Sequence, residues 1–393
     1  VRVVVAALGN ESGDVSISSS LDCTNHVLTA GEQVEHQSVH LTTLDEVLEG
    51  QQANLIKIDV EGFELMVLQG AERTLADPRT QAIMTHFSDR QVVPCRHYGE
   101  LFNPKGQNFR LQKQRPALVL AIKNGQRILP APVGYGIGAN HNYYFSHMLN
   151  CIYDCRYCFL QGMYRSAHTV LFVNYEDFID EMHAVAASHN DEAVHFFSGY
   201  DGDSLALEPL SGFTRSFVPA LAQHDNMLLE LRTKSTQVRK LLDMEPSSRC
   251  VAAFSFTPAA IAAATEHGVP PLSRRLDAMT RLQQHGWPVG LRLDPLIDCD
   301  NFESRYRELL QQLFASLDPD NIHSISFGPF RMPQGFFQQM VQLYPEEALF
   351  AQDMTRTDGM VSYGQQREQQ MREQLQSMLL DYVRADVLFP CIN

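Results

Sequence analysis

Several features that would point to particular protein classes are missing from this sequence of 393 residues. No run of about 18 consecutive apolar residues is present, so we expect no membrane-spanning helix. The opening residues, VRVVVAA, are too short and too soon interrupted by polar residues for a signal peptide. Initiator Met is also lacking, which suggests a fragment, and we find no internal repeat or low-complexity tract.

Positive charge is in short supply, with 31 Lys and Arg against 46 Asp and Glu and a net charge of −15. This balance excludes an overall basic surface of the kind that binds nucleic acid without sequence preference. Residues 96–127 are the exception, because they combine basic and aromatic residues with Glu100 as their single acid. We interpret this stretch as a candidate DNA-binding patch, the alternative being a solvated loop beside a strand at 117–122. Its basic residues are Arg96, Lys105, Arg110, Lys113, Arg115, Lys123 and Arg127.

A disulfide framework is missing as well. Five of the eight cysteines are scattered without a regular spacing, which favours free thiols and a cytoplasmic location. The other three, Cys151, Cys155 and Cys158, form a C-x3-C-x2-C motif. Three thiolates on one tight loop suit three corners of a [4Fe–4S] cluster and leave its fourth iron open, where S-adenosylmethionine (SAM) could bind.

A structural zinc site is the alternative for this motif. Zinc in such sites takes four closed ligands, and the sequence has no second C-x2-C pair. His147 lies four residues before the motif, but we expect it on an extended strand as an ordinary histidine. A zinc module that binds nucleic acid therefore stays as a second hypothesis.

The organisation of the chain changes near Ala76. Residues 1–76 read as strands at 1–8 and 55–60 and a helix at 65–75. Three stretches, at 6–10, 41–45 and 56–64 (IKIDVEGFE), resemble the C-terminal half of FkbM-type methyltransferases. The resemblance implies half of a Rossmann-like fold without its Gly-rich cofactor loop. We interpret this piece as an inactive remnant, and a functional SAM-dependent methyltransferase is the alternative.

A basic extension at 77–141 leads into a region with strand–helix alternation. We predict strands at 143–149, 193–197, 227–231, 250–256, 289–293 and 322–327. Helices are predicted between them at 176–187, 207–223, 236–244, 272–284 and 303–317. This pattern predicts an α/β fold, a partial (β/α)6 barrel of the TIM type over 142–332, with its chemistry at the C-terminal strand ends.

The tail, 333–393, is predicted to be helical. A helix at 365–383 carries an apolar stripe that we expect to pack on the core. The stripe consists of Met371, Leu375, Met378 and Leu379.

Four segments resemble the spore photoproduct lyase family of radical SAM enzymes. They are LNCIYDCRYCFLQG at 149–162, FFSGYDGD at 196–203, ELRTKS at 230–235 and FSF at 254–256. The resemblance covers about residues 77–393. It implies a radical SAM lyase that cleaves SAM to a 5′-deoxyadenosyl radical and reverses a thymine-dimer lesion in DNA. It also implies a reductant such as flavodoxin or ferredoxin.

The same resemblance implies individual roles. Lys234 would pair with the SAM carboxylate, and Ser198, Asp201 and Ser255 would hydrogen-bond SAM. Two departures affect the hydrogen relay. The resemblance implies a hydrogen-donating cysteine shortly after the second strand, but there is no cysteine between 159 and 249, and Phe159 stands just after the third motif cysteine, where the family has a tyrosine. A radical SAM enzyme with a non-DNA substrate is therefore the alternative. Candidate hydrogen donors are Tyr157, Tyr200 and Cys391.

Overall fold

The computed structural model describes residues 7–9, 12–18, 36–48, 97–102, 105, 107–132, 134–190 and 192–391. It divides into two compact units, residues 1–100 and 101–393. The predicted strand 55–60, the predicted helix 65–75, Arg96 and the predicted join near Ala76 lie outside the described residues.

The first unit contains a small sheet with the order β1-β3-β2. Strand β1 (Ala7–Gly9) runs parallel to β3 (His36–Thr43), and β2 (Gly13–Ser18) runs antiparallel to it. Helix α1 (Leu44–Leu48) follows β3 directly. Glu46 in this helix accepts a hydrogen bond of 2.9 Å from the Thr42 hydroxyl at the end of β3, so the strand and the helix are joined by a side-chain contact.

The second unit is built on an eight-stranded sheet with the order β19-β15-β14-β12-β11-β10-β6-β5. All neighbouring pairs are parallel except β5 with β6. The strands are β5 (Ile128–Pro130), β6 (His141–Phe145), β10 (Val194–Ser198), β11 (Met227–Thr233), β12 (Cys250–Ser255), β14 (Val289–Leu296), β15 (Ile322–Pro329) and β19 (Leu388–Pro390). Five of the six predicted strands are confirmed, whereas the predicted strand 143–149 ends at Phe145 in β6, and Met148–Leu149 form β7 in another sheet. The tail adds a seventh parallel strand, β19, that was not expected.

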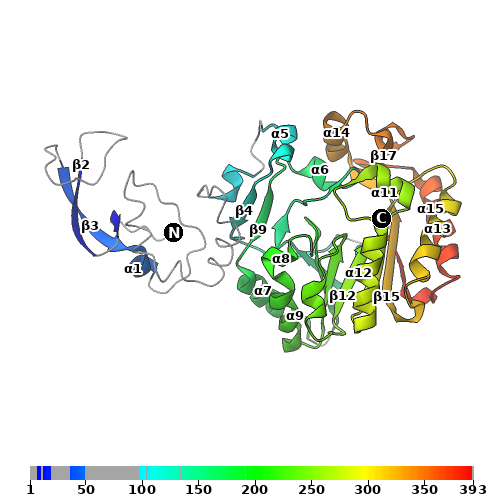
Figure 1. Cartoon of the computed structure of the whole chain (residues 1–393), viewed down its shortest axis with the longest axis horizontal. Coiled ribbons are helices and arrows are strands. Elements are labelled where there is room, and N and C mark those ends of the chain that lie inside the picture. Colours follow the sequence, from blue (N-terminus) through cyan, green and yellow to red (C-terminus); the bar gives the residue numbers. More distant parts are fainter. Residues whose placement is uncertain are drawn as a thin grey trace. The chain divides into compact units, whose positions relative to one another are not determined.

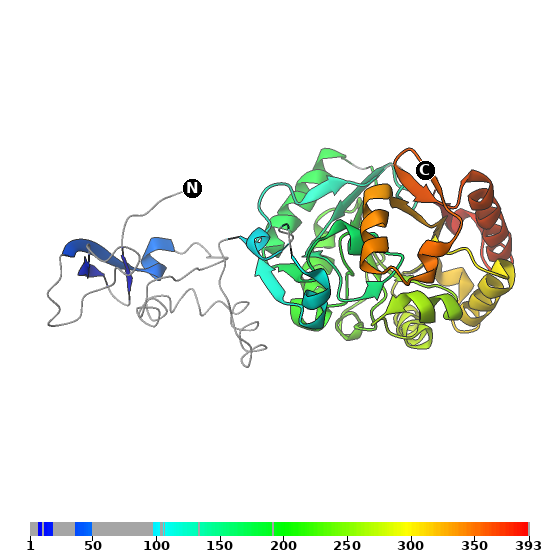
Figure 2. The same cartoon turned by 90° about the horizontal axis from the view of Figure 1, so that it is seen from above.

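Helices cover the outside of this curled sheet, as Figures 1 and 2 show. The longer ones are α7 (Tyr175–Ser188), α9 (Phe213–Ala220), α12 (Leu272–His285), α13 (Phe302–Phe314) and α15 (Gln365–Leu379). The apolar stripe predicted for the tail helix is confirmed, since all four of its residues are buried. Shorter helices between the strands are α8 (Glu208–Ser211) and α10 (Arg239–Leu242). The 3-10 turns described in this unit are η3 (Leu221–Gln223), η4 (Pro319–Asn321), η5 (Ala348–Ala351) and η6 (Ala385–Val387), whereas η2 (Tyr98–Glu100) belongs to the first unit.

The strand ends that carry chemistry in barrels of this type are covered by short elements. Figure 1 shows α5 (Phe109–Gln114), α6 (Leu160–Met163), α11 (Ala259–Thr265) and α14 (Gln334–Leu343) together at one end of the unit. The second unit also contains three small sheets. One consists of β4 (Leu118–Ala121), β9 (Thr169–Phe172) and β7 (Met148–Leu149), another of β8 (Asp154–Cys155) and β13 (Glu266–His267), and the third of β16 (Arg331–Pro333), β18 (Met360–Ser362) and β17 (Thr355–Thr357).

Phenylalanine rings pack densely between the sheet and its outer helices. Phe145 on β6 stacks on Phe217 of α9 with 5.2 Å between ring centroids, and both side chains are fully buried. Among the helices of the described residues, none combines the length and the apolarity needed to cross a membrane.

Candidate active site

A cavity of about 580 Å³ opens at the C-terminal ends of the central strands. Its walls come from the cysteine loop, the turn after β10, and the ends of β11, β12 and β14. All three clustered cysteines line it, together with Lys234 and Ser255. The position agrees with the rule that barrels of this type carry chemistry at the C-terminal strand ends.

The loop that carries the cysteines is shaped by Asn150. This residue adopts a left-handed backbone with φ 68°, a conformation that asparagine tolerates better than most residues. Its side-chain amide donates to the carbonyls of Ser166 and His168, each at 2.9 Å, and its carbonyl oxygen accepts from the Cys151 N–H at 2.9 Å. The loop entrance is therefore fixed before the first cysteine.

The thiols themselves are held by backbone contacts. The Tyr153 N–H points at the Cys151 sulfur at 3.4 Å, and the Cys158 N–H donates to the Cys155 carbonyl at 3.0 Å. Burial raises the pKa of all three thiols above the ordinary value, and Lys234 lowers the pKa of Cys155 and Cys158 in part. A metal must displace their protons on binding.

The arrangement of the thiols bears on what they could hold. Within the described part of the chain, no three His, Cys, Asp or Glu side chains are arranged to hold one metal ion. A single zinc ion needs its sulfur ligands about 2.3 Å away, whereas each thiolate of a [4Fe–4S] cluster binds a different iron. His147 offers no fourth ligand here, because it is buried and stacks on Phe213 at 4.0 Å.

Lys234 leaves the end of β11 beside the cysteines. Its ammonium lies 3.5 Å from Glu266 Oε1 and 5.5 Å from the centroid of the Tyr157 ring. Glu266 is also bound by Arg275 at 2.7 Å. Burial would raise the pKa of Glu266, but Lys234 and Arg275 outweigh it and lower that pKa. The carboxylate thus stays ionised and holds Lys234 at the cavity wall.

Tyr157, a predicted hydrogen donor, lines the cavity. Its hydroxyl donates to Glu266 and lies 3.4 Å from the Thr257 hydroxyl. Burial raises the pKa of Tyr157 well above the ordinary value. The phenol oxygen of Tyr157 is therefore held by its hydrogen bond to Glu266.

The turn after β10 was expected to supply Ser198 and Asp201, and neither lines the cavity. Ser198 is fully buried, pairs with Ser204 at 2.7 Å and donates to the Glu230 carbonyl at 2.9 Å. Asp201 accepts from the Ser146 hydroxyl on the side of β6. Both side chains therefore have partners away from the cysteines.

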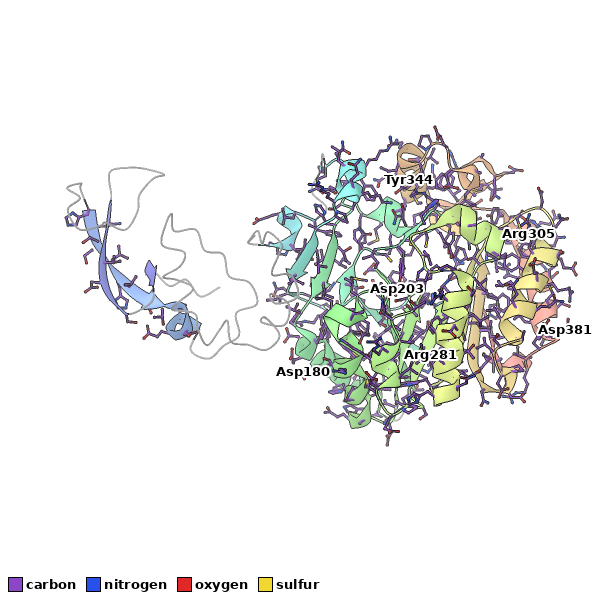
Figure 3. All side chains as sticks on the ribbon, viewed as in Figure 1. Asp180, Asp203, Arg281, Arg305, Tyr344 and Asp381 are labelled. Carbon is purple, nitrogen blue, oxygen red and sulfur yellow. The ribbon has the colours of Figure 1, made fainter. Side chains whose placement is uncertain are left out.

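Asp203 reaches the cavity from this turn instead, and Figure 3 shows it in the interior of the second unit. Its carboxylate accepts from the Thr233 hydroxyl at 2.7 Å and from the Lys234 N–H at 2.6 Å. Gly199 makes the turn possible, because with φ 85° a side chain there would come within 2.8 Å of the Arg232 carbonyl. The sequence could have indicated Asp203, because it lies two residues after Asp201 in the same FFSGYDGD segment.

Aromatic rings form another wall. Tyr200, a predicted donor, lies 4.4 Å from Tyr144, 5.7 Å from Phe159 and 5.8 Å from Tyr135 between ring centroids. The guanidinium of Arg232 lies 4.7 Å from the centroid of the Tyr135 ring. Sequence reasoning missed Tyr135 and Arg232, which come from a loop and from the middle of the ELRTKS segment.

An ion pair, Arg331 with Asp294, forms part of the cavity wall. Arg331 at the start of β16 lies 3.5 Å from Asp294 near the end of β14, and both residues line the cavity. Cys391, the third predicted donor, is not among the residues that line the cavity, and its sulfur lies 3.9 Å from Asp294 Oδ2. Burial raises the pKa of this thiol to about 12, so it is protonated near neutral pH.

Three cations of the basic stretch at 96–127 make contacts within the chain. Lys113 pairs with Asp154 at 2.5 Å, Arg127 pairs with Asp177 at 2.8 Å, and Arg110 donates to the carbonyls of Gln342 and Leu343. These cations hold α5 and β5 to the barrel. These three cations therefore already have partners within the chain.

Two family models match this chain. The "spore photoproduct lyase" family model matches residues 139–390, and the "methyltransferase FkbM domain" model matches residues 3–157. Spore photoproduct lyase of Bacillus subtilis (strain 168) is 24% identical over 261 residues, 65% of this chain and 74% of that protein. The enzyme of Geobacillus sp. (strain Y412MC61) is 23% identical over 178 residues, 45% of this chain and 52% of that protein.

Solved structures share the fold of most of this chain. A spore photoproduct lyase variant with bound AdoMet and dinucleoside spore photoproduct has a TM-score of 0.70 at 17% identity, covering 81% of this chain and 95% of that one. Spore photoproduct lyase complexed with dinucleoside spore photoproduct has a TM-score of 0.68 at 17% identity and the same coverage. Since the matching family model spans more than half of the sequence, this chain belongs to the spore photoproduct lyase family, a family of radical SAM lyases.

Proposed function

We propose that this enzyme binds a [4Fe–4S] cluster through Cys151, Cys155 and Cys158 and uses it to cleave SAM. The observation that carries the proposal is that the three thiols of one loop line one cavity together with Lys234. When bound, the cluster would supply the electron that breaks a carbon–sulfur bond of SAM and provides a 5′-deoxyadenosyl radical. A flavodoxin or ferredoxin would reduce it, in a cytoplasmic setting that keeps the thiols reduced.

The protein's part is to hold SAM next to the open iron. Lys234 would pair with the SAM carboxylate, since its ammonium already lies at the cavity wall 3.5 Å from Glu266 and charge-assisted hydrogen bonds suit a zwitterion. Ser255 lines the same cavity. We propose that the turn after β10 contributes Asp203, because the side chains of Ser198 and Asp201 have partners elsewhere.

The substrate we propose is a thymine-dimer lesion in DNA, removed from the base stack. Tyr135 and Tyr200 offer aromatic faces on which a base can stack. Arg232 and Arg331 offer cations for the phosphate backbone from within the cavity. Repair would proceed by hydrogen abstraction from the lesion, fragmentation of the linking bond, and return of a hydrogen atom.

The test is anaerobic reconstitution with iron and sulfide, followed by reaction with a reductant, SAM and the dinucleoside spore photoproduct. We expect absorbance near 400 nm, 5′-deoxyadenosine, and conversion of the lesion to the thymidine dinucleotide, with undamaged dinucleotide as the control. Bound zinc and no 5′-deoxyadenosine would contradict the radical mechanism.

A radical SAM reaction on a non-DNA substrate is the second candidate. It is favoured by Phe159, which lines the cavity where a tyrosine hydroxyl was expected. In that case SAM cleavage would occur without conversion of the lesion. Methyl transfer by the N-terminal piece is the third candidate, supported by the FkbM match, and would show as methylated product without 5′-deoxyadenosine.

A further inference from the structure

The hydrogen atom that completes repair needs a donor, and the expected position offers none. The stretch from 159 to 249 has no cysteine. We propose that Cys391, at the C-terminal end of the chain, is the catalytic thiol that donates this hydrogen atom. The proposal rests on the function proposed above and assigns the donor for that same site.

The tail brings Cys391 to the active end of the barrel by strand pairing. Strand β19 runs parallel to β15, with Phe327 opposite Pro390. The ladder continues by one residue, since the Cys391 N–H donates to the Phe327 carbonyl at 2.8 Å. Because β19 is parallel to the barrel strands, its C-terminal end lies at the same edge of the sheet as theirs.

Gly328 has no side chain, and this leaves space for the side chain of Cys391. A β-carbon at this position would lie 2.8 Å from Cys391 Cβ, 3.0 Å from Arg331 Nη1 and 3.5 Å from Asp294 Oδ1. Three side chains from three strands therefore converge over one bare backbone position. Two of them, Asp294 and Arg331, line the cavity that holds the cysteine loop.

Tyr157 and the other two described cysteines outside the C-x3-C-x2-C motif are placed less well. Cys250 is fully buried within β12, and Cys299 lines a different cavity together with Arg305 and Arg367. Tyr157 has its hydroxyl bound to Glu266. Cys391 is half-buried and lies next to Asp294 and Arg331, two residues that line the proposed substrate cavity.

The proposed step is a hydrogen-atom transfer. The S–H bond of Cys391 breaks, a C–H bond forms on the substrate radical, and a thiyl radical is left on Cys391. One electron from the ferredoxin- or flavodoxin-class reductant and one proton from solvent restore the thiol. Each turnover then consumes one SAM, whose adenosyl group keeps the hydrogen atom taken from the lesion.

Solvent deuterium tests this assignment because thiol hydrogens exchange with water. The reconstituted enzyme is run in D2O with the dinucleoside spore photoproduct, and product deuterium is measured by mass spectrometry. Wild type should place a single deuterium in the repaired dinucleotide. Cys391→Ser should form product roughly 100-fold more slowly, because a positioned reactant is lost, while 5′-deoxyadenosine continues to accumulate and the ratio of the two products rises.

Two further variants frame the result. Gly328→Ala should push Cys391 aside and raise the same ratio, whereas Cys299→Ser, a thiol in another cavity, should match wild type. Unchanged deuterium content and rate in Cys391→Ser would overturn the role of Cys391 and leave the repair function standing. Absence of repaired product from wild type would overturn the repair function, and the donor assignment with it.

Discussion

The buried carboxylate of Glu230 is matched by one cation from its own strand and one from another strand. Glu230 on β11 is fully buried and is bound by Arg292 of β14 at 2.6 and 3.0 Å and by Arg232 at 3.1 Å. Arg232 extends from Glu230 to the cavity, whereas Arg292 also donates a hydrogen bond to the Ser324 carbonyl at 3.0 Å. The interior of the barrel is therefore a polar network that fixes the direction of one cavity-lining cation.

At the residue scale, Lys234→Met should weaken SAM binding. The variant keeps the length of the side chain and removes the ammonium proposed to pair with the SAM carboxylate. Loss of a hydrogen bond to a charged group costs about 1.5–3 kcal/mol, so the Kd for SAM should rise roughly 10- to 100-fold. Calorimetric titration of the reconstituted enzyme measures this.

The matched control for that variant is Lys240→Met. The Lys240 ammonium donates to the Glu208 carbonyl at 2.8 Å on the outer side of the barrel, so the Kd for SAM should not change. An equal loss of affinity in both variants would contradict the role of Lys234.

Glu230→Gln should lower the free energy of unfolding by about 3–5 kcal/mol, because it leaves Arg292 buried beside a neutral amide. Glu303→Gln is the control, since Glu303 forms an exposed pair with Arg307 at 3.0 Å and such pairs contribute below about 1 kcal/mol. Urea unfolding monitored by circular dichroism compares the two. Similar small losses in both would contradict the importance of the buried network.

The pH dependence gives an independent check on Glu230. Burial would raise its pKa, but Arg292 and Arg232 outweigh burial and lower it from 4.5 to about 2. A lowered pKa stabilises the fold above pH 4.5, and this stabilisation is lost as the pH falls toward 2. Iron-free wild type should therefore lose stability more steeply between pH 4.5 and 2 than iron-free Glu230→Gln, and parallel curves would contradict this.

At the scale of elements, the cysteine loop depends on a close approach between α6 and α14. Gly162 in α6 faces the backbone of Phe336 in α14, and a β-carbon there would lie 2.4 Å from the Phe336 carbonyl oxygen. Backbone atoms cannot move aside as a flexible side chain can. Gly162→Ala should therefore cost about 1–3 kcal/mol of stability and lower the iron content after reconstitution.

Gly335→Ala in α14 is the control for this variant. Nothing lies within 4 Å of a β-carbon at Gly335, and alanine favours a helix over glycine by about 1 kcal/mol. Stability should stay the same or rise slightly, with iron content as in wild type. Equal iron content in Gly162→Ala would show that α14 can shift without disturbing the loop.

The same elements show what the sequence could predict. The barrel strands are buried apolar runs between amphipathic helices, so their period and length identified them. Strand β19 has only three residues, too few to show a hydrophobic period in the sequence. It forms because its backbone pairs with β15, which comes much earlier in the chain. The cysteines were predictable from local spacing, whereas Asp203, Arg331 and Tyr135 meet only through the tertiary fold.

At the scale of the whole molecule, the cavity belongs to one compact unit. Every residue that lines it lies in 101–393, and so do the strands of the curled sheet. The residues 1–100 form a separate unit with a three-stranded sheet of its own. Compact units with their own core generally fold alone.

A chain that begins at Leu101 should therefore fold and retain the chemistry. This start keeps Phe102, which is buried and lies 5.0 Å from Tyr164 between ring centroids. Iron content after reconstitution and the rate of 5′-deoxyadenosine formation should stay within about two-fold of those of the full chain. If the protein 101–393 folds but does not bind the cluster, part of the site lies in residues 1–100. If methyl transfer is seen with the full chain and is lost when residues 1–100 are removed, that unit has an activity of its own.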